Sequence, residues 1–245
     1  MKIYAALQMG EYHLNHCEDY LFTYNIGNDK IVCAVMDGCT MATDSYFAST
    51  LIGRLLRKIC KAKSYKELYL PAEQGTGVEG YLKSIIKELF SELAAAKNQL
   101  MLERNELLTT LILLLYDKRM NEGVVLAIGD GLVNINGVIT EFDQDNKPDY
   151  VGYHLSEDFE TWYGLQEQKI YFDKLKDITI ATDGIATFTE VAIKKTKEDI
   201  DPVEFLTSDA TNANSDDMLY LKLKTLENIY GIKPTDDLGM IRIIG

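Results

Sequence analysis

The chain has 245 residues, of which 47% are hydrophobic and 26% are charged. This is the composition of a globular protein, and it excludes disorder, collagen and coiled coil as descriptions of the whole chain. The chain has 25 Lys and Arg against 38 Asp and Glu, so its net charge is −13. Such a charge opposes binding to nucleic acid or to an anionic membrane surface, whereas acidic side chains are what hard cations bind.

The N-terminal segment and the cysteines bear on the compartment. The first residues lack the apolar region and cleavage site of a signal peptide, and the longest apolar run, Leu111–Leu115, is too short to span a membrane. No two cysteines have CxxC spacing, which disfavours a zinc site. These features predict a cytoplasmic protein with reduced thiols. Because no Pro/Gly/Ser-rich linker divides the chain, we expect a single domain over residues 1–245.

The first half of the chain predicts three strands followed by two long helices. Short apolar or alternating runs bounded by Gly, Asn and Asp predict strands over Lys2–Gln8, Tyr20–Asn25 and Lys30–Met36. Apolar residues at helical spacing predict helices over Ser45–Lys61 and Glu79–Arg104.

The second half predicts further strands, two helices and a loop around residues 143–149. The expected strands are Leu107–Tyr116, Val124–Ile128, Leu132–Ile135, Ile178–Ala181 and Leu238–Ile244, and the expected helices are Pro202–Leu206 and Asp217–Ile229. The second and third of these strands read as a pair joined by residues 129–131. Because strands and helices come in blocks, the pattern favours an α+β layered sandwich with mostly antiparallel sheets.

Three apolar strands end in an acid next to a glycine. The three segments are Asp37-Gly38, Gly129-Asp130-Gly131 and Asp183-Gly184. Acidic pairs, Glu18-Asp19 and Asp236-Asp237, also precede two strands. The end of one antiparallel strand and the start of its neighbour share an edge of the sheet. We therefore expect these carboxylates to converge.

A single Asp-Gly dipeptide is more often a turn than a ligand, but its recurrence after three buried strands favours a shared site. Clustered carboxylates stay ionised only when a cation sits among them. Oxygen ligands, in a chain with 3 His, favour Mg²⁺ or Mn²⁺ over Zn²⁺. Two such ions about 3.5–4 Å apart can activate a water molecule and clamp a phosphate.

Along the chain, the acids and a Thr-Thr pair lie in six short motifs: Cys17-Glu18-Asp19, Met36-Asp37-Gly38, Leu108-Thr109-Thr110-Leu111, Ile128-Gly129-Asp130, Ala181-Thr182-Asp183-Gly184 and Thr235-Asp236-Asp237-Leu238. In this order the motifs resemble those of the metal-dependent type 2C protein serine/threonine phosphatases. The match spans nearly the whole chain, which would be a divergent, bacterial-type member of that family. The resemblance implies a four-layer αββα sandwich with two central, mostly antiparallel sheets. It also implies hydrolysis of phosphoserine and phosphothreonine in proteins.

The resemblance further implies two Mn²⁺ or Mg²⁺ ions, and a third in some members. The residues that would hold them are Glu18, Asp19, Asp37, Gly38, Asp130, Asp183 and Asp236. Asp37 would bridge two ions, and Asp37 with Asp183 would carry catalysis through a metal-activated water. The Glu18 carboxylate and the Gly38 carbonyl would serve one ion, and Asp236 would serve the other.

Of the remaining two residues, Asp130 would belong to the third site with Asp183, and Asp19 would hold a water bound to a metal. No phosphoenzyme is implied, and the Cys-x5-Arg signature of the thiol phosphatases is absent from the sequence.

The sequence departs from the family where the family holds the substrate. Leu14 stands where an Arg usually contacts the phosphate, and Cys39 stands where a His often follows Asp-Gly. The family motif Gly-Asp-Ser-Arg reads Gly129-Asp130-Gly131-Leu132 here. The segment between Asp130 and Asp183 also looks reduced. His13 and His16 are candidates to replace the missing Arg, although a loop His is more often simply solvated.

Three functions therefore compete. The retained acids favour an active phosphatase with phosphorylated protein substrates. The departures favour a weak or inactive regulator on the same fold that binds a protein partner. A third possibility is a two-metal phosphohydrolase with a small-molecule or nucleotide substrate, although no nucleotide-binding fingerprint supports it.

Overall fold

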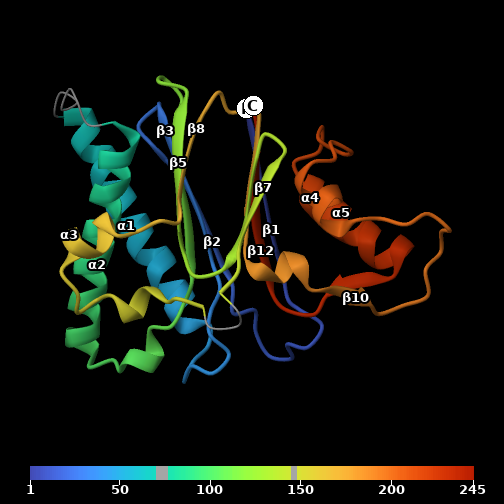
Figure 1. Cartoon of the computed structure of the whole chain (residues 1–245), viewed down its shortest axis with the longest axis horizontal. Coiled ribbons are helices and arrows are strands. Elements are labelled where there is room, and N and C mark those ends of the chain that lie inside the picture. Colours follow the sequence, from blue (N-terminus) through green and yellow to red (C-terminus); the bar gives the residue numbers. More distant parts are fainter. Residues whose placement is uncertain (70–76, 145–147) are drawn as a thin grey trace.

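Two five-stranded sheets lie face to face between two layers of helices (Figure 1). The computed structural model describes residues 1–69, 77–144 and 148–245. The first sheet has the order β1 (Lys2–Gln8), β12 (Leu238–Ile244), β9 (Asp177–Ala181), β6 (Gly131–Ile135) and β7 (Val138–Phe142). The second has the order β2 (Tyr20–Ile26), β3 (Lys30–Met36), β4 (Leu111–Asp117), β5 (Glu122–Ile128) and β8 (Lys169–Asp173). All strand pairs in the described residues run antiparallel.

Helices cover the outer face of each sheet, which confirms the predicted αββα sandwich (Figure 1). One layer consists of α1 (Phe47–Tyr69), α2 (Val78–Leu100) and the short α3 (Phe159–Gly164). The other contains α4 (Pro202–Thr207) and α5 (Met218–Thr225), which continues as the π-helical turn η4 (Leu226–Tyr230). The remaining elements are the 3₁₀ turns η1 (Arg104–Glu106), η2 (Val151–Tyr153) and η3 (Asp183–Ala186), and a ribbon of β10 (Phe188–Glu190) and β11 (Ile232–Pro234).

The central strands are buried on both faces. In β3, alternate residues Cys33 and Val35 pack between the two sheets, whereas Val32 and Ala34 pack under α1 and α2. Because successive side chains of a strand point to opposite faces, a strand buried on both sides reads as a continuous apolar run. This explains why β3, β4 and β5 stand out in the sequence.

The strand register places the predicted acids at one end of the sandwich. Lys2 of β1 pairs with Ile244 of β12, so the two termini lie together at the opposite end (Figure 1). Beyond β3 and β4, Gly38 forms an isolated antiparallel bridge with Thr109. The residues that follow β3 therefore lie beside those that precede β4.

Several expected boundaries differ. The helix α2 ends at Leu100, where Met101 adopts a left-handed φ of 55°, so the predicted extension to Arg104 is wrong. The strand β4 begins only at Leu111. The expected pairing of 124–128 with 132–135 is also wrong, because β5 and β6 belong to different sheets. The expected loop around 143–149 lies partly outside the described residues.

Candidate metal and phosphate site

Asp37 is fixed at the end of β3 by the two threonines that precede β4. Its backbone N–H donates to Thr110 Oγ1 at 3.1 Å, and its carbonyl accepts from Thr109 Oγ1 at 2.6 Å and from the Thr110 N–H at 3.0 Å. Gly38 is required next to it, since a Cβ there would lie 2.0 Å from the Ser45 carbonyl oxygen. The Thr-Thr motif thus sets the position of the Asp37 backbone.

Three of the predicted ligands come together in space. Asp37, Asp130 and Asp183 each offer one carboxylate oxygen, and the three oxygens lie within 4.8 Å of one another. Asp130 lies where the chain crosses from β5 to β6, between Gly129 and Gly131. Their φ values of +92° and +138° are conformations that glycine adopts more readily than other residues. Asp183 opens the η3 turn directly after β9.

Asp19 is a fourth acid close to this cluster, next to Asp37. It is 4% exposed, and its Oδ2 accepts a hydrogen bond from Thr182 Oγ1 at 2.7 Å. Its other oxygen, Oδ1, is buried and has no N–H or hydroxyl donor in the described residues. The Asp37 carboxyl is a hydrogen-bond partner of Asp19, and two carboxyl groups share such a bond only while one of them is protonated. A cation bound at these acids would replace that proton.

Burial, and for most pairs the neighbouring charges, raises the pKa values of the acids in this cluster. Burial first, and then the charges of Asp19, Asp183 and Asp236, raise the pKa of Asp37 well above its usual range. Burial, together with neighbouring acids, raises the pKa of Asp19 to about 8 and that of Asp183 to about 7. None of Asp19, Asp37, Asp130 and Asp183 forms an ion pair with a Lys, Arg or His of the described residues.

This donor set fits a hard divalent cation. Converging carboxylate oxygens with raised pKa values and no protein cation are stabilised when a metal ion replaces the protons. The donors are all oxygen, as Mg²⁺ and Mn²⁺ prefer.

The other predicted ligands lie around this core with different surroundings. The Glu18 Oε2 accepts from Thr40 Oγ1 at 2.9 Å. Asp236, at the start of β12, is not one of the three converging acids, and its side chain is 42% exposed. Its charge nevertheless contributes to the raised pKa values of Asp37 and Asp183.

Asp237 has a structural role that the sequence analysis did not assign. Its Oδ1 accepts from the Gly10 N–H at 2.7 Å, and its Oδ2 accepts from the Glu18 N–H at 2.5 Å. It also lies 2.8 Å from Nδ1 of His13, whose Nε2 is 3.4 Å from Asp236. Asp237 therefore ties the N-terminal loop to the start of β12.

The two histidines proposed for the phosphate are already engaged. Burial lowers the pKa of His13, but Asp237 and Asp236 outweigh burial and raise it. His16 packs its ring against Tyr46, with ring centroids 4.6 Å apart. Leu14, where the family Arg is expected, is 87% exposed.

Tyr150 is a site residue that the sequence analysis missed. Burial, a hydrogen bond with Cys39, and the charges of Asp37 and Asp130 raise the pKa of its hydroxyl. Cys39 is buried, as a small side chain packed in a turn would be. Tyr150 lies in the segment expected to be loop, and no local sequence pattern distinguishes it.

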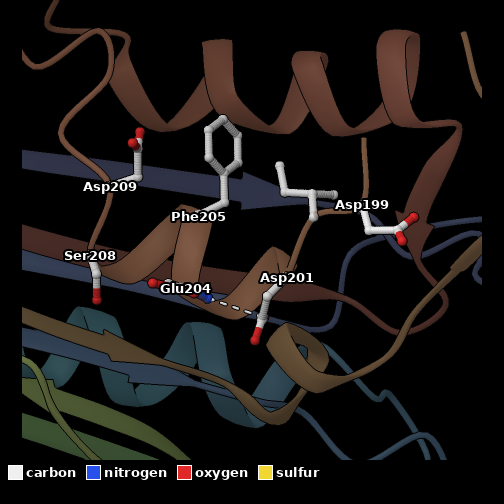
Figure 2. Close-up of a pocket in the computed structure, with 7 residues that line it drawn as sticks. Asp199, Asp201, Glu204, Phe205, Ser208 and Asp209 are labelled. Carbon is white, nitrogen blue, oxygen red and sulfur yellow. Dashed lines mark hydrogen bonds between the residues drawn. The ribbon is translucent and has the colours of Figure 1, made fainter. Parts of the chain in front are cut away.

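A second acidic region lies elsewhere, on α4 and the segment before it (Figure 2). There Asp201 caps α4 by accepting from the N–H groups of Val203 and Glu204. Asp199 pairs with Lys194, and Asp209 pairs with Lys222. These acids have partners within the chain, so this pocket does not resemble the carboxylate cluster.

Comparisons with known proteins agree with this geometry. Residues 10–222 match the family model described as Protein phosphatase 2C. No curated protein sequence matches significantly. Within the described residues, no helix is long and apolar enough to cross a membrane.

Solved structures share the fold at low sequence identity. A bacterial serine phosphatase is 14% identical, with a TM-score of 0.59, over 99% of this chain and 96% of that one. RsbX in complex with magnesium is 16% identical, with a TM-score of 0.51, over 98% and 92%.

The phosphatase domain of SpoIIE from Bacillus subtilis, solved with a fragment of its regulatory domain, is 15% identical with a TM-score of 0.57. The match covers 99% of this chain but spans only 63% of the length of that one. The family match over most of the sequence, together with the sandwich and its carboxylates, shows that the chain belongs to the protein phosphatase 2C family.

Proposed function

We propose that this protein hydrolyses phosphoserine and phosphothreonine in proteins with two Mn²⁺ or Mg²⁺ ions. The observation that carries the proposal is the convergence of Asp37, Asp130 and Asp183 within 4.8 Å on a type 2C fold. The solved structure of RsbX with magnesium supports the choice of a hard cation. The ions supply charge neutralisation for the phosphate and activation of the attacking water.

Each acid has a proposed task. Asp37, whose backbone is held by Thr109 and Thr110, would be a ligand shared by both ions. Asp183 and Asp236 would hold one ion, and Glu18 with the Gly38 carbonyl would hold the other.

The two remaining acids complete the proposed site. Asp130 and Asp183 would hold a third, weaker ion. Asp19, fixed by Thr182, would orient a water molecule beside the ions.

The test is hydrolysis of a generic aryl phosphate and of phosphoserine and phosphothreonine peptides, with millimolar Mn²⁺ or Mg²⁺ and with EDTA. We expect metal-dependent activity that chelation abolishes. Turnover that survives thorough chelation would contradict the proposal. Turnover of aryl phosphate or nucleotides but not of peptides would favour a small-molecule phosphohydrolase.

A regulator that binds phosphoproteins without hydrolysing them is the second candidate. It is favoured by Leu14, which leaves the usual phosphate-holding position with an exposed apolar side chain. Binding of a phosphopeptide without turnover at any metal concentration would establish this alternative.

A further inference from the structure

The rim of the site carries an arginine that the family motifs do not account for. Arg104, in the η1 turn, is exposed, and its guanidinium lies 4.3 Å from the centre of the Tyr153 ring. Within the described residues it forms no ion pair with a carboxylate. An Arg stacked on an aromatic ring keeps the N–H groups of its edge available for an anion.

Two tyrosines connect this arginine to the carboxylate cluster. The Tyr153 and Tyr150 rings meet edge to face, with centroids 5.4 Å apart and planes at 77°. Next to Tyr150, the Val151 N–H donates to the Thr109 carbonyl at 3.1 Å, and Thr109 in turn binds the Asp37 carbonyl. Cys39, two residues after Asp37, and the charge of Asp37 both raise the pKa of the Tyr150 hydroxyl, which places it close to them. Arg104, Tyr153 and Tyr150 therefore form a continuous arm of contacts that leads from Arg104 to the segment around Asp37.

The backbone holds this arm in place. The η1 turn is closed by a capping box in which the Glu103 N–H donates to Glu106 Oε2 at 2.8 Å. The η2 turn is bonded to the segment that precedes β4, since the Val151 N–H donates to the Thr109 carbonyl at 3.1 Å. Gly152 allows close packing of the two turns, because a Cβ there would lie 2.4 Å from the Leu107 carbonyl oxygen. Such prior ordering lowers the entropy cost of binding.

We propose that Arg104, Tyr153 and Tyr150 form a substrate-binding arm, in which Arg104 pairs with an acidic side chain about three residues from the phosphorylated residue. This inference rests on the proposed function. Successive steps of 5.4 and 4.3 Å separate the Tyr150 ring from the guanidinium. Three extended residues span about 10 Å, so a peptide whose phosphorylated residue lies beside Tyr150 and that follows the arm brings its third neighbour within side-chain reach of Arg104.

Charge complementarity supports an acidic group at this place. The protein carries a net charge of −13, which repels an acidic phosphopeptide unless a cation is available locally. The planar guanidinium matches a carboxylate with two parallel hydrogen bonds. Arg104 is two rings away from the group next to Asp37, so it is placed for a neighbouring side chain and not for the phosphate being hydrolysed.

The test uses three phosphoserine peptides of the same neutral sequence. One has Glu three residues before the phosphoserine, one has Glu three residues after it, and one has neither. We expect wild-type kcat/KM to be about fivefold higher for one acidic peptide than for the neutral one, the scale of an exposed ion pair. Arg104→Ala should abolish this preference and Arg104→Glu should reverse it. Arg119→Ala is the matched control, because Arg119 is an exposed arginine at the far end of β4.

Three outcomes would overturn the inference: no wild-type preference, an unchanged preference in both Arg104 variants, or an equal loss on all three peptides. The last would mean that Arg104 holds the phosphate common to them. Failure of the proposed function is seen separately, as no metal-dependent turnover of aryl phosphate by the wild type. In that case fluorescence anisotropy measures Kd for the same peptides, and the ratio of Kd values replaces that of kcat/KM.

Discussion

Two acid-rich regions of this molecule differ in how their charges are balanced. Where the first sheet packs under α4 and α5, Asp209 pairs with the fully buried Lys222, and Asp177 of β9 pairs with the fully buried Arg242 of β12 at 2.6 and 2.9 Å. At the ends of β3, β5 and β9, the carboxylates converge on each other, and in the described residues no Lys or Arg pairs with them.

The pKa values show the difference. The Asp209 carboxyl, although burial raises its pKa, is brought to about 2 by Lys222 and Thr211. The pKa of Asp19 moves the other way, to about 8, because burial outweighs the hydrogen bonds of Asp19 with Thr182 and Asp37. A carboxylate paired inside the chain stabilises the fold, whereas carboxylates without a cation destabilise it and are retained for a ligand.

The largest expected effect concerns activity. Asp37→Asn and Asp183→Asn should each lower the metal-dependent kcat/KM by about a thousandfold, beyond the 10–100-fold cost of losing a partner outside the coordination sphere. Steady-state hydrolysis of aryl phosphate measures this. Asp199→Asn, in the second acidic region, is the matched control and should retain activity. A loss of less than about tenfold in both variants would show that Asp37 and Asp183 are not needed for catalysis.

For stability, we expect the larger loss from a variant in the paired region and not from one in the carboxylate cluster. Asp177→Asn should lower the free energy of unfolding by about 3 kcal/mol, because it leaves Arg242 buried without its carboxylate. In the absence of metal, Asp37→Asn should leave stability unchanged or raise it, since it removes a repelled charge. Urea unfolding in EDTA compares the two. If Asp37→Asn destabilises the metal-free protein as much as Asp177→Asn does, the distinction between the regions is wrong.

Stability of the metal-free protein should depend on pH through Asp19 and Asp183. Their pKa values rise from 3.8 to about 8 and about 7 on folding, so the folded state holds more protons than the unfolded state between these limits. Their contribution is fully present below about pH 4 and is lost as pH rises to about 8, at no more than about 1.4 kcal/mol per pH unit for each carboxyl. Unfolding midpoints in EDTA from pH 5 to 8 measure the slope, and Asp19→Asn should flatten it. An unchanged slope in that variant would contradict the assignment.

The smallest effect concerns the position where the family Arg is replaced by leucine. Leu14→Arg should lower KM for a phosphopeptide a few-fold with little change in kcat, because a cation that grips the phosphate acts on ground state and transition state alike. Kinetics on one peptide decides this. A low-micromolar wild-type KM, or no change in the variant, would show that another residue already holds the phosphate.

The sequence predicts the central strands and the edge strands β1 and β2 well, but it misses the other two edge strands, β7 and β8. The β3 and β12 bounds agree with prediction because both are buried apolar runs bounded by turn residues. The edge strands β7 and β8 were not expected, since their partly exposed residues give weak alternation. The β5–β6 connection was misread as a hairpin, because Gly129 and Gly131 permit a crossing between sheets as readily as a tight turn.

For the site, motif order located the acids but not their surroundings. Asp37, Asp130 and Asp183 were found because each follows a buried strand beside a glycine. Tyr150 precedes the η2 turn, and Arg104, expected at the end of a helix, lies in the η1 turn. Only the packing of η1 against η2 brings the two residues together. Neither has a local pattern that marks it in one sequence.

The central claim is that the carboxylate cluster requires a divalent cation. Isothermal titration calorimetry of the metal-free protein with Mn²⁺ at pH 7 tests it most directly. The account predicts saturable binding with release of protons, since raised carboxyl pKa values mean that metal replaces protons. Asp37→Asn should abolish or sharply weaken this binding, and Asp199→Asn should preserve it. No binding by the wild type, or the same binding in Asp37→Asn, would contradict the claim.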